Sequence, residues 1–334
     1  MNKFERLRLF LSSIQEPSYR FDQIIGSIFL KKEADFESMF FLSKELRSKL
    51  KQEFTPFLAV SRVGEKVSSQ GEKVLFSLFD SEKIESVKMI YRDWQSFCLS
   101  SQVGCLTNCL FCATGKMGFK RNLTTDEIVD QLLYFHLKGE EIDTISFMGM
   151  GEPLANPNFF EALGVLTASQ FFNISQRKIN ISTVGFLPTL KQLINDFPSI
   201  NVALSLNNPF PQERQRLMPI EKRFPLKKVL PILTYHARKN RRKIFLAYIL
   251  FSGVNDAPRH IQGLSGLIRD QGEAAYLYHV NLIDYHPVAG CSLTASGRKK
   301  MTWFKSQLEK QGIKTTIRRS LGLSFQGACG QLRT

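Results

Sequence analysis

The chain has 334 residues, 43% of them apolar and 22% charged, with a formal net charge of +15. This apolar content supports a packed core, and six cysteines over such a length exclude a small disulfide-stapled scaffold and are typical of a reducing cytoplasm. The excess of positive charge favours a polyanionic partner, most simply nucleic acid, over a basic enzyme that has no such partner. No apolar run reaches membrane-spanning length, and residues 1–14 do not form a secretory signal.

The first 97 residues contain two patterns. Residues 1–56 predict three helices, because apolar residues recur at helical spacing, Pro17 ends the first helix and Ser43 is placed to cap the third. We interpret them as an N-terminal helical accessory domain. Residues 57–97 contain short apolar runs between polar turns, which predicts an antiparallel strand extension. Its predicted strands cover residues 57–63, 73–79, 84–91 and 96–100.

From residue 98 to residue 290, predicted strands alternate with predicted helices. The strands cover residues 142–148, 178–183, 201–206, 243–251 and 278–283. Their near-continuous apolar character predicts a parallel sheet covered by helices. About six such units indicate an α/β fold with a partial (β/α)6 barrel, in which the active site lies at the C-terminal ends of the strands. Residues 291–334 form a C-terminal extension with one more helix and strand.

Three of the six cysteines, Cys105, Cys109 and Cys112, form a C-x3-C-x2-C pattern. Several thiolates converging on one point suit a soft metal or an iron–sulfur cluster. Three thiolates would leave one iron of a 4Fe–4S cluster open to a substrate, and Phe111 would give the cluster a dry wall. The alternatives are unligated buried thiols or a structural zinc site, for which Cys98 is the candidate fourth ligand.

A second motif, Gly149-Met-Gly-Glu-Pro, follows the predicted strand 142–148. Its two glycines would let the backbone pass close to a ligand, and Glu152 can accept hydrogen bonds from an ammonium group. Taken alone, the motif is equally compatible with an ordinary glycine-rich turn that carries a solvated glutamate.

A three-cysteine loop followed by a GEP-type motif resembles the radical S-adenosylmethionine (radical SAM) enzymes. More closely, the chain resembles the RlmN/Cfr family of RNA adenine methyltransferases, over essentially its whole length. The residues that carry the resemblance are 100–105, 111–115, 121–124, 147–156, 217–220, 253–256, 279–283 and 328–332. Residues 127–137, 146–151 and 277–283 are more similar to the Cfr branch than to RlmN.

The resemblance implies a radical SAM barrel whose 4Fe–4S cluster is held by the three cysteines of the loop. It implies two SAM molecules per turnover: one methylates Cys329 in the C-terminal extension, and cleavage of the second takes a hydrogen from that methyl group. The carbon radical then adds to an adenine. Cys98 would release the product by attacking the Cys329 sulfur, which leaves a disulfide. Glu85 matches the family's base for the adenine proton.

By position, the family's SAM contacts correspond to Gly151, Glu152, Ser182, Ser205, Leu206, Asn207 and Asn281. Ser182, Ser205 and Asn281 fall in or at the ends of predicted strands, as a barrel site requires, although a lone Ser or Asn there more often bonds to local backbone. The family usually has histidine at position 207, and Asn207 cannot titrate. Cys291 matches no family position, and we interpret it as incidental.

These implications predict a methyltransferase acting on C8 of an adenosine in the peptidyl transferase centre of 23S ribosomal RNA, with resistance to antibiotics as the consequence. The predicted partners are the 23S RNA before ribosome assembly is complete and an electron donor such as flavodoxin, with a monomeric, cytoplasmic enzyme and no membrane. The alternatives are RlmN-type methylation of C2, with transfer RNA as a further substrate, and a zinc-stabilised RNA-binding protein without catalysis.

Basic residues are spread along the chain, and each is by default a solvated surface charge. The favoured phosphate contacts are those near the cysteine loop and on the last predicted strand. They are Lys116, Lys120, Arg121, Arg318 and Arg319. The target base is expected to be flipped out of its stack to reach the reacting methyl group. The other basic residues include Arg177, Lys178, Arg214, Arg242 and Lys243.

Overall fold

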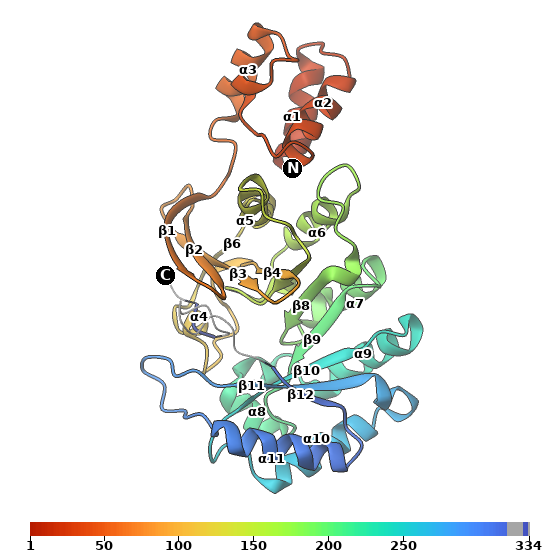
Figure 1. The fold of residues 1–334 in the computed structure, drawn as a ribbon. Coiled ribbons are helices and arrows are strands. Elements are labelled where there is room, and N and C mark those ends of the chain that lie inside the picture. Colours follow the sequence, from red (N-terminus) through yellow and green to blue (C-terminus); the bar gives the residue numbers. More distant parts are fainter. Residues whose placement is uncertain (319–329, 333–334) are drawn as a thin grey trace.

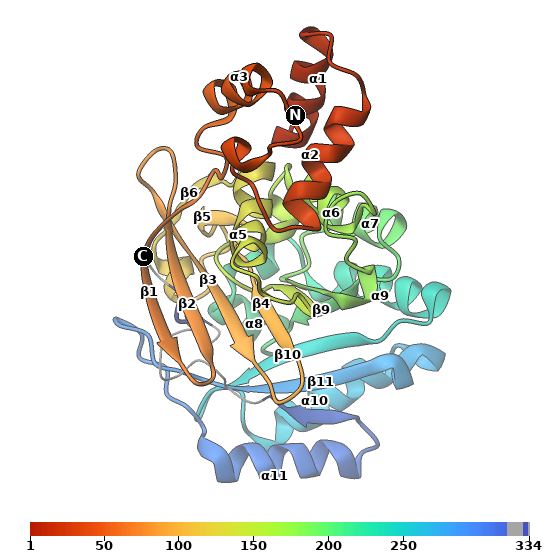
Figure 2. The same ribbon diagram turned by 45° about the horizontal axis from the view of Figure 1, so that its top comes forward.

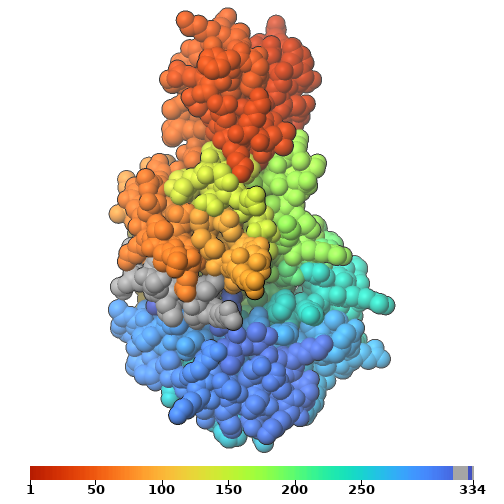
Figure 3. Space-filling model, in the orientation of Figure 1, coloured from red at the N-terminus to blue at the C-terminus, as the bar shows by residue number. Residues whose placement is uncertain are grey.

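Three helices form an N-terminal lobe at one end of the molecule in a computed structural model that describes residues 1–318 and 330–332 (Figure 1 and Figure 3). They are α1 (Lys3–Ser13), α2 (Tyr19–Phe29) and α3 (Lys44–Phe54). Ser43 caps α3, as predicted, because its side chain accepts a hydrogen bond from the backbone N–H of Leu46. The predicted accessory helices are therefore present.

The lobe is attached to the rest of the molecule by a buried ion pair. Lys3 Nζ lies 2.6 Å from Asp130 Oδ2 on helix α5 (Thr125–Leu137), and both side chains are buried. The same carboxylate oxygen accepts a hydrogen bond from the backbone N–H of Ala59, and Lys3 also donates to the carbonyl of Phe57. These bonds fix the connection between the lobe and the first strand onto α5.

The body of the described chain is one sheet of ten strands in the order β1-β2-β3-β4-β7-β8-β9-β10-β11-β12. The strands are β1 (Ser61–Ser68), β2 (Gly71–Ser77), β3 (Lys83–Ile90), β4 (Gln95–Cys98), β7 (Thr144–Phe147), β8 (Ile179–Thr183), β9 (Asn201–Ser205), β10 (Ile244–Leu250), β11 (Tyr278–Asp284) and β12 (Thr315–Ile317). Neighbours from β1 to β4 are antiparallel, and those from β4 to β12 are parallel.

Among the described residues, the edge strands β1 and β12 do not pair with each other, so the sheet is an open, partial barrel, as predicted. Strand β4 ends the antiparallel part and begins the parallel part, because it pairs antiparallel with β3 and parallel with β7. Strand β12 adds a further parallel strand from beyond residue 290. The antiparallel extension and the barrel therefore share one continuous sheet.

The remaining α-helices are outside the sheet (Figure 1). They are α6 (Phe159–Thr167), α7 (Leu187–Asp196), α8 (Pro211–Leu217), α9 (Leu226–Asn240), α10 (Pro258–Arg269) and α11 (Gly297–Lys310). Short 3-10 turns are η1 (Phe36–Ser38), η2 (Pro153–Ala155), η3 (Gln176–Lys178), η4 (Pro219–Lys222) and η5 (Gly272–Leu277). Helix α8 was not predicted. The strand predicted at residues 57–63 is misplaced: β1 begins at Ser61, because Phe57 and Leu58 pack against the core and belong to the connection described above.

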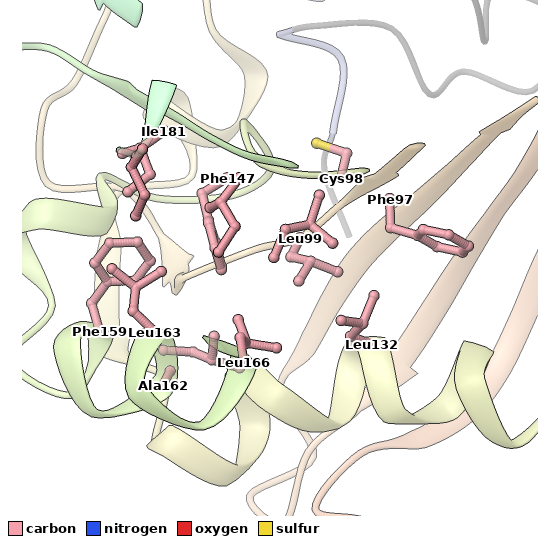
Figure 4. Packing of buried hydrophobic residues seen from close by; sticks show 14 of the residues in the cluster. Phe97, Cys98, Leu99, Leu132, Phe147, Phe159, Ala162, Leu163, Leu166 and Ile181 are labelled. Atoms are coloured by element: carbon pink, nitrogen blue, oxygen red, sulfur yellow. The ribbon is translucent and has the colours of Figure 1, made fainter. Parts of the chain in front are cut away.

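Most barrel strands have one apolar face and one more polar face, which corrects the prediction of near-continuous apolar strands; β10 fits that prediction, because Phe245, Ala247 and Ile249 occupy its second face. In β8, Ile179 and Ile181 are buried, whereas Asn180 and Ser182 are only partly buried. Figure 4 shows the apolar side, where side chains of the sheet meet those of α6. There the rings of Phe147 and Phe159 pack edge to face with centroids 4.7 Å apart. We call the other, inner face the lumen.

No helix in the described ranges is both long enough and apolar enough to cross a membrane.

Candidate active site

The cysteine loop is closed at its base by a small ladder that the sequence did not predict. Strands β5 (Gln102–Gly104) and β6 (Phe119–Asn122) pair antiparallel, and the backbone N–H of Cys105 donates to the carbonyl of Gly118 at 3.0 Å. Helix α4 (Ala113–Lys116) follows the third cysteine and leads back to β6. The ladder thus fixes both ends of the loop at the C-terminal end of β4.

The three cysteines of the loop line one cavity of about 150 Å³ at the C-terminal ends of the barrel strands. Thr107, which the sequence analysis did not single out, lies between two of them. Its Oγ1 is 3.1 Å from the sulfur of Cys105 and 3.5 Å from that of Cys109. Thr107 therefore orients two of the three candidate ligands from within the loop.

The donor set fits an iron–sulfur cluster. Burial raises the pKa of the Cys105 thiol to about 11 and that of Cys109 higher still, so a bound metal must displace both protons. A structural zinc ion needs four ligands around one point. Within residues 1–318 and 330–332, no three His, Cys, Asp or Glu side chains are placed to hold a single ion. Three thiols around a cavity fit an extended cluster better than zinc.

The glycines of the second motif serve the chain's own packing. A β-carbon on Gly149 would lie 2.6 Å from the carbonyl oxygen of Leu99, and one on Gly151 would lie 2.5 Å from the Cβ of Gln102. Gly151 also has a φ of +99°, which favours glycine. The sequence predicted that glycine is needed here so that the backbone can approach a ligand, and Gly149 and Gly151 do line the cavity. The structure adds a second reason, which is the close approach of both glycines to residues 99–102.

Glu152 is buried at the wall of the same cavity. Its Oε1 accepts a hydrogen bond from Thr183 Oγ1 at 2.6 Å, and its Oε2 accepts one from the backbone N–H of Val184 at 2.9 Å. Burial raises the pKa of Glu152 to about 7, against the opposing effect of these hydrogen bonds. A carboxylate has about four acceptor positions, so capacity remains for a ligand's amino group.

Four other predicted contacts reach the cavity, and one does not. Ser182, Ser205, Asn207 and Asn281 line it. The hydroxyl oxygens of Ser182 and Ser205 lie 3.4 Å apart. Leu206 lies between two lining residues with its side chain buried in the core. The chain itself engages Asn207: its Oδ1 accepts from the backbone N–H of Ile249 at 2.9 Å, and its φ is +55°. A structural role therefore accounts for Asn207.

Cys98 and Glu85 lie on one face of adjacent strands. Cys98 is paired with Val87 of β3, and Glu85 is two residues before Val87, so the alternation along a strand gives all three the same face. Figure 4 shows Cys98 pointing away from Leu99 and the apolar core. Glu85 is buried, with Oε1 2.6 Å from Lys73 Nζ.

Glu85 lines a second cavity, of about 400 Å³, which reaches the cysteine loop at Ala113 and the C-terminus at Gln331. Cys329, the predicted methyl acceptor, lies outside the described residues. The next residue, Gly330, accepts a hydrogen bond through its carbonyl from the backbone N–H of Ala113 at 2.9 Å. The described C-terminal residues therefore lie against the cysteine loop.

Several basic residues have carboxylate partners, and one of them, Arg214, is buried, which corrects its interpretation as a surface charge. Arg214 is fully buried, where it pairs with Glu221 and donates to the carbonyl of Ser205. Arg121 lies 2.6 Å from Asp80 and 2.8 Å from Glu127, and Lys120 lies 2.7 Å from Glu82. The sequence offers no local signal for these pairs. Arg319 lies outside the described residues.

Cys291, which we interpreted as incidental, contacts the cysteine loop. Its thiol donates to the carbonyl of Leu110 at 3.3 Å, and it packs beside the small apolar cluster that includes Phe111 and Phe251. The segment after β11 therefore supports the cysteine loop from outside.

Comparison with known proteins was made on the whole chain. The radical SAM superfamily matches residues 99–261, and the ribosomal RNA large subunit methyltransferase N-terminal domain matches residues 2–55. The chain is 45% identical to "Ribosomal RNA large subunit methyltransferase Cfr" of Lachnoclostridium phytofermentans, over 99% of this chain and 97% of that one. Its counterpart in Staphylococcus warneri is 42% identical over 99% and 96%. The crystal structure of a radical SAM methyltransferase from Sphaerobacter thermophilus superposes with a TM-score of 0.92, at 32% identity, over 99% and 98% of the chains.

Proposed function

The chain belongs to the Cfr group of ribosomal RNA large subunit methyltransferases within the radical SAM superfamily, and from this membership we propose that it methylates C8 of an adenosine in 23S ribosomal RNA. The family expected from the sequence motifs is thereby confirmed. The observation that carries the proposal is one cavity at the strand ends, which brings together three thiols, the buried carboxylate of Glu152 and the polar side chains of Ser182, Ser205 and Asn281.

Cys105, Cys109 and Cys112 would hold a 4Fe–4S cluster, and Glu152, Ser182, Ser205 and Asn281 would surround SAM beside it. When bound, the cluster supplies the electron that cleaves SAM, which is chemistry that no side chain provides. The protein contributes by positioning the cluster and SAM next to each other. The glycines of the second motif bring Glu152 against the loop, and burial of Cys105 and Cys109 excludes water from their thiols.

The carbon transfer would use two further cysteines. Cys329 accepts a methyl group from one SAM, and the methyl carbon, after loss of a hydrogen, bonds to the adenine. The radical adduct would lose one electron, which the cluster can accept, and the adenine proton, which Glu85 would take. The Cys98 thiolate would then attack the Cys329 sulfur, so that the carbon–sulfur bond breaks, its electron pair goes to the carbon, which takes up a proton to become the methyl group, and a disulfide remains. Two observations support this assignment. Cys98 and Glu85 lie on the same face of adjacent strands, and the carbonyl of Gly330, next to Cys329, accepts a hydrogen bond from Ala113 directly after the cysteine loop.

The experiment that tests this function uses the resolving cysteine. In the Cys98→Ala variant the acceptor remains but the adduct cannot be released, so protein purified from cells should carry covalently bound RNA. Cys98→Ala/Cys329→Ala should carry none, and Cys291→Ala, which alters a thiol beside the loop, should also be RNA-free. Denaturing gels before and after ribonuclease measure the bound RNA. An RNA-free Cys98→Ala protein, or an equally loaded double variant, would require the assignment to be abandoned.

A second measurement locates the methyl group. Mass spectrometry of the 23S fragment from cells that express the protein should find the added methyl on C8 of the target adenosine. A methyl found on C2 alone would replace the proposed reaction with that of the RlmN branch.

The remaining parts of the proposal follow from family membership and chemistry. The enzyme would act in the cytoplasm as a monomer, on 23S RNA before ribosome assembly is complete, with a flavodoxin-like protein as electron donor. Because the modified adenosine belongs to the peptidyl transferase centre, its methylation would confer resistance to antibiotics that bind there. Comparing antibiotic susceptibility of cells with the parent protein and with Cys329→Ala tests the last point.

A further inference from the structure

A groove of about 350 Å³ opens at the end of the barrel lumen opposite the cysteine loop. Its lining includes Tyr91 and Trp94 from the turn between β3 and β4, and Arg177 from the segment before β8. In Figure 2 this turn reaches the level of β10 and β11. The groove shares Met148 and Asn281 with the wall of the active-site cavity. The lumen is therefore lined continuously from the groove to the candidate active site.

Cations that are far apart in the sequence gather at this end. Parallel strands all begin at the same edge of a sheet, so the residues just before β8, β10 and β12 lie along one edge, at every second strand. Those positions hold Arg177 and Lys178, then Arg242 and Lys243, then Lys314. Within the described parts of the chain, none of the five has a carboxylate partner, although Arg242 donates to the Asn201 side chain.

The cations act on one another and on a nearby histidine. The pKa of His279 is lowered by burial and further by Lys243 and Lys314. The pKa of Arg242 is lowered by burial and further by Arg177. Two acidic residues lie at the turn: Asp93 within it, 3.8 Å from the neighbouring Arg92, and Asp143, which accepts a hydrogen bond from the backbone N–H of Gln95. The five cations outnumber these two carboxylates, so this end of the barrel has an excess of positive charge among the described residues.

An exposed aromatic pair borders the same groove. The rings of Tyr91 and Trp94 stack with centroids 3.8 Å apart and planes within 4° of each other. Trp94 is 41% exposed, although it is one of the largest apolar side chains. Tyr91 holds the indole in one orientation, and the face of the indole that Tyr91 does not cover is available for stacking. An aromatic face next to cations is the combination that binds unpaired nucleotides.

We propose that this groove binds the RNA strand on one side of the target adenosine, with phosphates at Arg177 in the groove and at the exposed Lys178 next to it in the chain, and with one flanking base stacked on Trp94. The inference rests on the proposed function, and it names where the substrate RNA enters. A strand held here is single-stranded, because only an unpaired base can stack on the indole.

The test compares two double charge reversals in the cluster-loaded enzyme. Arg177→Glu/Lys178→Glu changes the groove, and Arg298→Glu/Lys299→Glu makes the same change in charge at exposed positions of α11, on the outer side of the sheet. Binding of the 23S hairpin that contains the adenosine is measured as a function of salt. The groove variant should bind about tenfold or more weakly at low salt, and its salt slope should fall by about 1.4, since each phosphate contact to a single strand contributes about 0.7. The α11 variant should remain near the parent.

A second pair of variants tests the stacking. Trp94→Ala should weaken hairpin binding about five- to a hundredfold, whereas Trp94→Phe keeps an aromatic face and should retain most of the affinity. Methylation of Cys329 by SAM without RNA should be unchanged in all four variants, which shows that each is folded.

Equal affinity and salt slope for the two charge reversals would overturn the proposal. So would a groove variant that binds RNA normally but is reduced more slowly by flavodoxin, because the basic face would then serve an acidic protein. RNA methylation by the parent enzyme is measured in parallel. If the parent methylates the hairpin and the groove variants bind like the parent, only the groove assignment fails. If the parent binds but does not methylate, the proposed function fails instead.

Discussion

The two ends of the barrel lumen use basic residues in opposite ways. Around the cysteine loop, Arg121, Lys120 and Arg214 are each paired with a carboxylate, and the Arg121 guanidinium holds the pKa of Asp80 below its usual range. At the other end, Arg177 and Lys178 have no carboxylate partner among the described residues. The cations of the first set stabilise the folded chain, whereas those of the second remain available to a polyanion.

The difference shows that net charge does not identify a binding surface. Of the 15 positive charges in excess, those next to the predicted chemistry looked the best suited to bind phosphate, yet Lys120 and Arg121 are occupied. A carboxylate next to a cation repels a phosphate and so opposes the attraction of that cation for it. The position of the unpaired cations is therefore more informative than their number.

The largest expected effect concerns the cysteine loop, at the first of the two ends of the lumen. Cys109→Ala removes one of three thiols from a cavity that contains no other described thiol donors, so it should abolish both iron retention and cleavage of SAM. Iron content and deoxyadenosine formation are the measurements. Cys291→Ala, in a thiol that contacts the loop from outside, should retain both. A Cys109→Ala protein that forms deoxyadenosine at the parent rate would contradict the radical assignment.

The second prediction separates structural from available cations. Arg214→Met leaves Glu221 buried without its partner, and breaking a buried pair in this way costs about 3–5 kcal/mol in the free energy of unfolding. Arg216→Met, two residues later and exposed, should change stability by less than about 0.5 kcal/mol, as should Arg177→Met. Urea unfolding measures all three. Equal destabilisation of Arg214→Met and Arg177→Met would remove the distinction between the two ends.

The third prediction uses a histidine as a reporter of the positive end. Burial, with a further contribution from Arg242, lowers the pKa of His236 to about 4. Because the folded state disfavours the imidazolium, the contribution of His236 to stability is complete above pH 6.5 and is lost as the pH falls through 4. The loss amounts to about 3 kcal/mol at most.

Comparison of the parent with His236→Gln by urea unfolding between pH 7 and pH 4 checks this effect. The variant should lose less stability over that range than the parent does. If both lose the same amount, His236 does not report on this end of the barrel.

The smallest effect concerns SAM. Glu152→Ala should weaken SAM binding about ten- to a hundredfold while the cluster remains, because a hydrogen bond to a charged group contributes about 1.5–3 kcal/mol. Thr183→Val is the matched control, since it removes the internal donor to Glu152 and keeps the carboxylate. Calorimetry of the cluster-loaded proteins measures the affinity. Unchanged affinity in Glu152→Ala would show that the second motif is only a turn.

Much of the fold and part of the site could be predicted from the sequence. The alternation of strands and helices, the cap at Ser43 and the cysteine loop are local patterns, because helix and strand periods and turn residues act over a few positions. The three thiols lie within eight residues, so chain connectivity alone brings them to one cavity. Glu152 could be placed near them because strand ends meet at one edge of a parallel sheet.

Other features were decided only by the tertiary structure. The lumen face, the second role of Gly149 and Gly151, the partners of Arg121 and Arg214, and the gathering of Arg177 with Lys314 all depend on which strands become neighbours and in which register. Residues that meet in this way are separated by tens of positions, and a local pattern contains no information on their distance. A one-residue change of register would reverse which face each side chain occupies, so paired and unpaired cations are distinguished only once the sheet has formed.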